Sequence, residues 1–200
     1  MPESLEKFSR LVVIGGSAGG VAAVRKLLGE LRAPLAFPVL IVLHRMKNVD
    51  SRLDLVLQKF TEVPLSEVED KQLIAPNHIY IAPPNYHVYV EKAGYFALSS
   101  DELVNFSRPS IDVSMESIAQ VMGKGALGVV LTGANDDGSA GLKAIESKGG
   151  LALIQDPSDA EIPRMPEAAM RAVPDAPVLP LSLIAQFLNE YNANNIPPTD

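Results

Sequence analysis

An apolar run at residues 11–14 leads directly into a glycine-rich segment, residues 15–20, whose single hydroxyl side chain is Ser17. The run is rich in valine and isoleucine and predicts a buried strand, whereas residues 21–31 carry apolar side chains at helical spacing. Glycines on both sides of the serine permit a tight turn and close approach of a ligand, and the amides at a helix N-terminus stabilise negative charge. The segment therefore predicts a strand, turn and helix with Ser17 on the turn.

Two kinds of site are built on such a turn, and the first is a phosphate site, which is the commoner use of glycine-rich strand-to-helix turns. Ser17, however, stands where the dinucleotide fingerprint has its second glycine, and no Lys-Ser/Thr pair closes a P-loop. The next apolar run, residues 39–43, ends in His44, where a dinucleotide-binding unit has an acidic residue. Gly15-x-Ser17-x-Gly19 also matches the nucleophile elbow of acyl-transfer hydrolases. We therefore favour a serine nucleophile with His44 as general base, with a phosphate-binding α/β module as the alternative.

A carboxylate to orient the imidazole is expected from the polar loop after a third apolar run, residues 127–131. That loop contains Asp136 and Asp137. One of them is expected to cap the helix that follows, and the other to point at the imidazole. Because the carboxyl ends of parallel strands meet at one edge of a sheet, Ser17, His44 and one of the two aspartates are expected to converge. No histidine follows the aspartates, so the order serine, histidine, acid disfavours the α/β-hydrolase fold.

The other two histidines, His78 and His87, flank an alternating segment and are interpreted as ordinary strand-edge residues. Two histidines without cysteines or an H-E-x-x-H helix make a weak metal site. We therefore expect neither a metal ion nor a cofactor.

The whole chain, residues 1–200, is expected to form one α/β domain, with flexible tails at about 1–10 and 193–200. The fold class is a doubly wound, mainly parallel sheet with helices on both faces and an antiparallel hairpin near one edge. The helices are predicted at residues 21–31, 51–61, 111–122, 139–147, 166–172 and 182–192, and the hairpin region at residues 79–81, 88–90 and 95–98.

Several short motifs, taken together and in order, resemble the catalytic domain of the chemotaxis protein-glutamate methylesterases, the CheB family. They span nearly the whole chain, and lie at residues 13–20, 42–44, 75–84, 107–113, 131–138, 155–157 and 165–169. The resemblance implies hydrolysis of glutamyl methyl esters on methylated chemoreceptors, often with deamidation of glutamines. It also implies that Ser17 is the nucleophile, His44 the base and Asp137 the orienting acid.

The chain departs from the family pattern at two places. Ala18 stands where the family commonly has threonine, and residues 134–138 read Ala-Asn-Asp-Asp-Gly where Met-Gly-Asn-Asp-Gly is common. The side chains of the triad survive both changes, so altered rate or specificity is expected. The departures also motivate a second alternative, a catalytically weak or silent CheB-like interaction protein.

Contacts to the substrate and to the oxyanion are expected from residues near these motifs. Arg45 and Arg108 are candidates for orienting an acidic receptor helix, and Met165 for lining the cleft. Backbone amides near Ser17, with one from the loop at residues 133–134, are expected to hold the oxyanion.

Composition and chain length bear on partners and location. The net charge of −7 argues against nucleic-acid binding. There is no cysteine and no apolar run long enough to cross a membrane, which favours a cytoplasmic protein without membrane insertion. Family members often carry an N-terminal receiver domain, but only ten residues precede the first predicted strand here. Constitutive activity, or control by a separate regulatory partner, is therefore expected.

Overall fold

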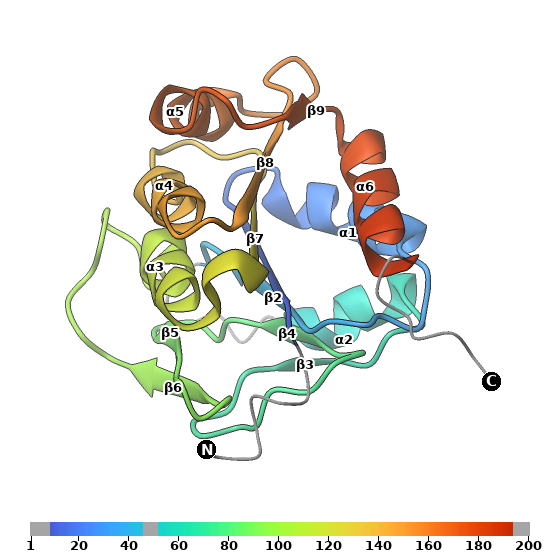
Figure 1. The fold of residues 1–200 in the computed structure, drawn as a ribbon, viewed down its shortest axis with the longest axis vertical. Helices are drawn as coiled ribbons and strands as arrows, with labels where there is room; N and C mark the ends of the chain where they lie inside the picture. The colour runs from blue at the N-terminus through green and yellow to red at the C-terminus, as the bar shows by residue number, and fades with distance from the viewer. Residues whose placement is uncertain (1–8, 46–51, 194–200) are drawn as a thin grey trace.

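A computed structural model describes residues 9–45 and 52–193, and its centre is a seven-stranded sheet in which all neighbouring strands are parallel (Figure 1). The strand order is β3-β4-β2-β1-β7-β8-β9. The bounds are β1 Leu11–Gly16, β2 Val39–Leu43, β3 Leu65–Glu67, β4 Ile79–Ile81, β7 Ala126–Val130, β8 Leu151–Gln155 and β9 Val178–Leu179.

Helices cover both faces of the sheet, as Figure 1 shows. One face is covered by α1 (Gly20–Glu30), α2 (Leu53–Leu57) with the short η2 (Gln58–Phe60), and α6 (Leu181–Ala193). The other is covered by α3 (Ile111–Met122), α4 (Ser139–Ser147) and α5 (Arg164–Ala172). The predicted doubly wound α/β class is thus confirmed.

Alternation along the central strands explains the two hydrophobic layers. In β1, Leu11 and Val13 pack toward α3 and α4, whereas Val12 and Ile14 pack toward α1 and α6. All four residues are fully buried. A strand buried on both faces is apolar without interruption, which is why these runs stand out in the sequence.

The direction of strand addition reverses at β1. From β1 the sheet grows through β2 and β4 on one side and through β7 and β8 on the other. Ligands of open α/β sheets bind beyond the carboxyl ends of the strands at such a switch point. The loops that follow β1, β2 and β7 therefore meet where a site is expected.

The antiparallel part of the structure is smaller than predicted. β5 (His87–Val90) and β6 (Phe96–Ser99) form a separate two-stranded antiparallel sheet, and β5 packs on α3. Residues 79–81, which the sequence predicts as part of the hairpin region, instead form β4 inside the parallel sheet, between β3 and β2. Its three residues are buried on both faces, a burial that a three-residue apolar stretch does not reveal in the sequence.

Helix positions agree closely with the apolar spacing. α3 and α4 have the predicted bounds, and α1, α5 and α6 begin one or two residues earlier. The segment predicted at 51–61 is a short α2 followed by a 3-10 turn. The proposed tails, apart from residues 9, 10 and 193, lie outside the described residues. None of the described helices is both long and apolar enough to cross a membrane.

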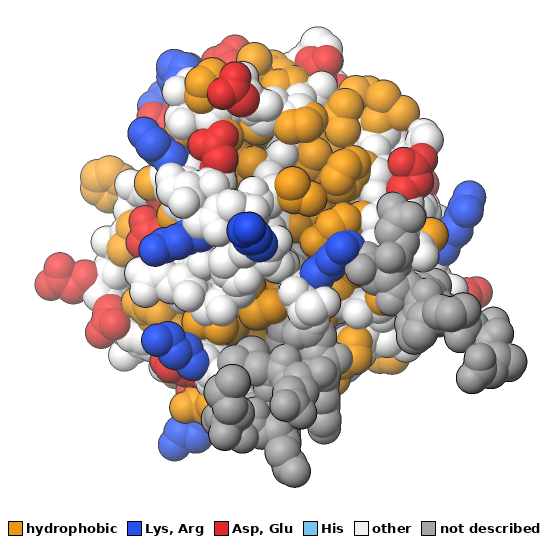
Figure 2. Space-filling view, in the orientation of Figure 1, with side chains coloured by type: hydrophobic (Ala, Val, Ile, Leu, Met, Phe, Trp, Pro, Cys, Tyr) orange, Lys and Arg blue, Asp and Glu red, His pale blue; other side chains and the backbone are white. Residues whose placement is uncertain are grey.

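The molecular surface shows apolar exposure away from the switch point as well. In the orientation of Figure 2, hydrophobic side chains gather over β8, β9 and α6. Leu151 in β8 and Leu183 in α6 are 44% and 45% exposed. Leu183 on α6 can therefore be compared with exposed apolar side chains that lie near the candidate site.

Candidate active site

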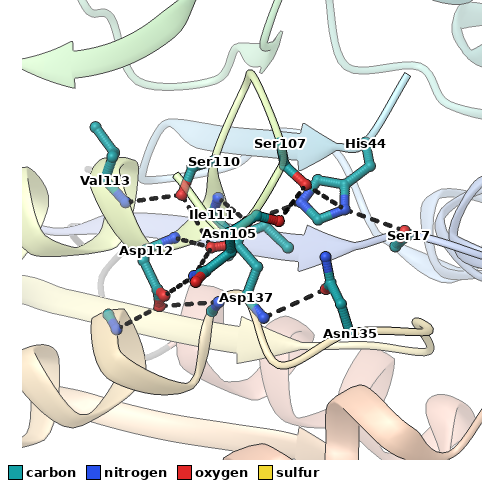
Figure 3. A network of polar contacts seen from close by, with 12 residues as sticks. Ser17, His44, Asn105, Ser107, Ser110, Ile111, Asp112, Val113, Asn135 and Asp137 are labelled. Atoms are coloured by element: carbon teal, nitrogen blue, oxygen red, sulfur yellow. Dashed lines mark hydrogen bonds and ion pairs between the residues drawn. The ribbon is translucent and has the colours of Figure 1, made fainter. Parts of the chain in front are cut away.

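Three side chains from three strand ends form one line of hydrogen bonds. Ser17 follows β1, His44 follows β2, and Asp137 lies in the loop after β7. Ser17 Oγ lies 3.1 Å from Nδ1 of His44, and Nε2 of His44 lies 2.8 Å from Oδ2 of Asp137 (Figure 3). The structure brings together the three residues that the sequence analysis selected.

The carboxylate fixes the state of the imidazole. An ionised carboxylate only accepts hydrogen bonds, so Nε2 of His44 carries the proton and donates a hydrogen bond to Asp137. Nδ1 is then the unprotonated nitrogen, and it accepts the hydrogen bond of the Ser17 hydroxyl. This is the arrangement in which an imidazole can withdraw a proton from a serine.

Asp137 is fully buried at the N-terminus of α3. Besides His44, four groups donate to its carboxylate: the amides of Ile111 (2.7 Å) and Asp112 (3.2 Å), the hydroxyl of Ser110 (2.9 Å) and the side-chain amide of Asn105 (3.1 Å). Burial by itself raises the pKa of Asp137, but the hydrogen bonds from His44 and Ile111 outweigh it and hold that pKa below its ordinary value of 3.8. The carboxylate therefore stays ionised while buried.

A second carboxylate, Asp112, is buried beside the first. Its Oδ1 accepts hydrogen bonds from the amides of Gly138 and Gly141, at the N-terminus of α4, and its Oδ2 accepts from Asn105. Burial raises the pKa of Asp112 to about 6, although the Gly141 amide opposes that shift, and the charge of Asp137 adds to it. Each of the two helices is thus capped by a carboxylate from the other segment. Asp137, which precedes α4, accepts from amides at the start of α3, and Asp112, which lies in α3, accepts from amides at the start of α4.

This exchange corrects one prediction. Neither Asp136 nor Asp137 caps α4 with its side chain, since the N-cap residue is Gly138 in a left-handed conformation (φ 95°) and the capping carboxylate comes from Asp112. Asp136 is exposed, and its carboxylate pairs with Arg164 at 3.0 Å. Of the two adjacent aspartates, only Asp137 reaches the imidazole.

The turn that carries Ser17 is braced by Thr132. The Ser17 amide donates to the Thr132 carbonyl at 2.9 Å, and the Thr132 hydroxyl donates to the Ala18 carbonyl at 2.9 Å. Gly19 closes the turn at φ 76°, and a Cβ there would lie 2.8 Å from Cβ of Glu161. The Thr132-Gly133 pair belongs to a motif noted in the sequence, but its contact with Ser17 became visible only in three dimensions.

Amides for an oxyanion are available on the same turn. Within the described part of the chain, the amides of Ala18 and Gly19 have no hydrogen-bond acceptor, and neither has that of Ala134. The amide of Gly133, which we had included as a candidate, donates to the Ile162 carbonyl at 3.1 Å and is therefore engaged. The loop at 133–134 can contribute one amide at most.

Two residues that sequence reasoning missed lie on the short segment 104–107, which is closed by mutual backbone hydrogen bonds between its end residues. Asn105 donates to both Asp112 (2.8 Å) and Asp137 (3.1 Å), and Ser107 Oγ lies 3.3 Å from Nδ1 of His44. Between them Phe106 is 97% exposed. Positive φ angles at Asn105 (49°) and Phe106 (61°) aim the two polar side chains inward, and no local sequence signal marks such a turn.

The arginines and the methionine considered as substrate contacts are held by the protein itself. The buried guanidinium of Arg45 pairs with Glu67, and Arg108 donates to the carbonyls of Ser100 (2.5 Å) and Asp101 (2.6 Å). Met165 is 1% exposed and packs against Gly133. These three side chains therefore support the loops of the site.

The remaining histidines have structural contacts. His87 is buried at 1% exposure, where Nε2 donates to the Glu102 carbonyl and Nδ1 accepts from the Ser110 amide. His87 lies at the start of β5, as a strand-edge residue is expected to, but it is buried and its contacts brace the segment before α3. His78 lies beside Ser66, and burial lowers its pKa. Among residues 9–45 and 52–193, no group of three histidine or acidic side chains is placed to hold a metal ion.

Comparison with known proteins shows similarity over nearly the full chain. Residues 12–188 match the family model described as CheB methylesterase. A Leptospira interrogans protein named "Putative protein-glutamate methylesterase/protein-glutamine glutaminase" is 43% identical, with 92% of this chain and 96% of that protein covered. An Escherichia coli protein of the same name without "putative" is 33% identical over 88% of this chain, which spans about half (51%) of that relative. The crystal structure of the Thermotoga maritima CheB methylesterase catalytic domain superposes with a TM-score of 0.86 at 26% identity, covering 91% of this chain and 98% of the other.

Proposed function

The chain belongs to the CheB methylesterase family, and on that premise we propose that it is a serine hydrolase that removes methyl esters from glutamyl side chains of chemoreceptors. Ser17 is the nucleophile, His44 the general base and Asp137 the acid that orients the imidazole. The single observation that carries this assignment is the unbroken line of hydrogen bonds from Ser17 Oγ through His44 to Asp137.

The first half of the reaction forms an ester with the enzyme. Nδ1 of His44 takes the hydroxyl proton as Ser17 Oγ attacks the carbonyl carbon of the methyl ester. Asp137 stabilises the imidazolium that results, and the amides of Ala18 and Gly19, which have no acceptor in the described part of the chain, can donate to the oxyanion. When the tetrahedral intermediate collapses, the bond to the methoxy oxygen breaks, Nδ1 returns its proton to that oxygen, and methanol leaves.

The second half regenerates the enzyme. Water loses a proton to Nδ1 of His44 and attacks the carbonyl carbon of the glutamyl ester on Ser17. The bond from that carbon to Ser17 Oγ then breaks and Nδ1 returns its proton to Oγ, which releases a glutamate carboxylate and restores the serine hydroxyl. With a glutamine side chain the same steps release ammonia in place of methanol. This supports the second activity that appears in the names of the relatives.

The decisive experiment follows methyl groups on a purified methylated chemoreceptor by mass spectrometry. The wild-type protein should remove them, and Ser17→Ala should be slower by roughly four to six orders of magnitude with an unchanged melting temperature. Labelling of Ser17 by a fluorophosphonate probe gives an independent measure of nucleophile activation. Undiminished demethylation by Ser17→Ala would exclude the assignment, and an unlabelled wild-type serine would favour a silent interaction protein.

A further inference from the structure

An apolar groove begins at the candidate nucleophile and runs along α1. A hollow of about 420 Å³ is lined by Ser17, by residues of α1 including Val21 and Arg25, and by residues of α2 and η2 including Val56 and Phe60. We call this hollow the α1–α2 groove. Since Ser17 is one of its walls, a substrate that places an ester carbon at Ser17 Oγ must lie in or directly beside it.

The walls of the groove are exposed to solvent although they are apolar. Val21 is 44% exposed, Val56 is 46% exposed and Phe60 is 39% exposed. The first lies on α1 and the other two on the facing segment after β2, so both sides of the groove present apolar surface. Covering apolar side chains of a partner would remove this surface from water.

The groove contains one charged side chain. The guanidinium of Arg25 lies over the ring of Phe60, 5.4 Å from its centroid. Among the described residues, no carboxylate lies within ion-pair distance of Arg25. An arginine held on an aromatic ring with its donors free is suited to a carboxylate on the partner.

The spacing of these groups along α1 matches the repeat of an α-helix. Val21 and Arg25 lie four residues apart within α1 and so follow one face of that helix, whereas Ser17 lies on the turn that precedes it. Side chains four positions apart on a second α-helix are spaced by the same rise of about 6 Å. A helix lying along α1 can therefore present side chains one turn apart to Val21 and Arg25, while its end lies beside Ser17 in the same hollow.

Resting on the function proposed above, we propose that the α1–α2 groove binds the receptor as an amphipathic helix lying along α1. The methyl-esterified glutamate lies at Ser17, an apolar side chain about one turn away contacts Val21 and Val56, and a free carboxylate about two turns away pairs with Arg25. The groove thereby selects, among glutamyl esters, those that carry both neighbours on one helix face.

Two substitutions with matched controls test this. Val56→Asp places a charge in the apolar wall, and Arg25→Glu reverses the charge at the far end. The controls are Leu183→Asp on α6, which alters a side chain of nearly equal exposure (45%), and Arg171→Glu on α5, which reverses an exposed charge away from the groove.

The readouts are KM and kcat for methanol release from a methylated receptor fragment, and the rate of fluorophosphonate labelling of Ser17. Both groove variants should raise KM by about tenfold or more, since each opposes the partner group directly. Labelling by the small probe should stay within about twofold of the wild type in the two control variants, and in the groove variants it reports whether the protein is folded and Ser17 is still activated. For Arg25→Glu, KM should fall again when the receptor fragment carries a lysine in place of the carboxylate two turns from the ester.

The KM for the receptor fragment decides whether the groove binds the receptor. Receptor KM values within about twofold of the wild type in both groove variants, or equal increases in the two controls, would overturn the groove. If Val56→Asp loses labelling through misfolding, Arg25→Glu and its lysine-substituted substrate decide the question. Failure of the proposed function is a separate result, because the wild-type protein would then release no methanol from the receptor.

Discussion

The carboxylate side and the hydroxyl side of the site are built in opposite ways. Asp137 is fully buried and accepts five hydrogen bonds, four of them from residues 105–112. The Ser17 hydroxyl is partly exposed, its one partner among the described residues is His44, and it borders an open groove. The protein is thus rigid where a charge must be held without water, and open where the substrate must enter.

The largest effect that sharpens this comparison is expected from Asp137→Asn. An asparagine amide must face at least two of the buried donors that now point at the carboxylate, so the free energy of unfolding should fall by roughly 3 kcal/mol. The wrong imidazole tautomer should lower kcat for methanol release by about 10⁴-fold. Ser17→Ala, in contrast, should lose activity while keeping its stability.

The neighbouring carboxylate provides the control for this variant. Asp136 is exposed and, in the part of the chain that the structure describes, its carboxylate pairs only with Arg164, so Asp136→Asn should change the unfolding free energy by less than about 0.5 kcal/mol. Denaturant titration of the two variants and methanol release measure both effects. Equal stability of Asp137→Asn and Asp136→Asn would show that the carboxylate side is not held as tightly as its contacts indicate.

A smaller effect is expected from Asn105→Gly, which removes the amide that joins the two buried carboxylates. Glycine tolerates the positive φ of this position (49°), so the change tests the side chain without adding backbone strain. Loss of two hydrogen bonds to carboxylates should lower kcat by about tenfold and leave KM unchanged. Asn85→Gly, at another positive φ (69°) and without a hydrogen bond to Asp112 or Asp137, is the control, and a similar loss of kcat there would contradict the role of Asn105.

The two sides also differ in how far the sequence predicted them. Ser17 and His44 each follow an uninterrupted apolar run, so a local pattern was enough to place them at one edge of the sheet. The donors around Asp137 come from Asn105, Ser110 and the start of α3, 25 to 32 residues earlier in the chain.

The packing of α3 against α4, rather than any local pattern, sets these contacts. The bounds of both helices were predicted because apolar spacing is local. The exchange of carboxylates between them was not, since a cap supplied by another helix has no signature at the helix that it caps. The same holds for the turn at 104–107, where two non-glycine residues adopt positive φ.

The second buried carboxylate, Asp112, makes the stability of the carboxylate side depend on pH. Because folding raises the pKa of Asp112 from 3.8 to about 6, the folded protein holds this proton to higher pH than the unfolded chain does. Its contribution to stability is therefore greatest at low pH and is lost as pH rises through about 6. Asp137, with its lowered pKa, acts in the opposite direction, with stability lost as pH falls through that pKa, but it is present in both proteins compared below.

Asp112→Asn should remove this dependence. Its Oδ1 can still accept from Gly138 and Gly141, while its amide replaces the Oδ2 that accepts from Asn105, a loss that is the same at every pH. The unfolding free energy of the variant relative to the wild type should therefore rise between about pH 4 and 6 and stay level above pH 7. Denaturant titrations at pH 4.5, 6 and 7.5 measure the difference, and a difference that falls with pH would contradict the raised pKa.

The smallest effect is expected where the two sides meet, at Ser107. Its Oγ lies 3.3 Å from the same nitrogen of His44 that Ser17 contacts at 3.1 Å. Once Ser17 is acylated it has no proton to donate, and Ser107 is then the remaining hydroxyl that holds the ring in place until the attacking water takes its position at Nδ1. Ser107→Ala should therefore slow deacylation by about threefold, because loss of one neutral hydrogen bond costs somewhat less than about 1 kcal/mol.

Acylation provides the contrast, because Ser17 itself holds the ring during that step. The rate of fluorophosphonate labelling, which ends at the first covalent bond, should not change in Ser107→Ala, and Ser107→Thr should restore deacylation. Rapid-quench measurement of methanol release separates the two steps, since a burst that appears only in Ser107→Ala reports slow deacylation. If labelling slows as much as turnover, Ser107 orients the imidazole from the start, and the hydroxyl side of the site is less independent of the carboxylate side than the contacts of Ser17 indicate.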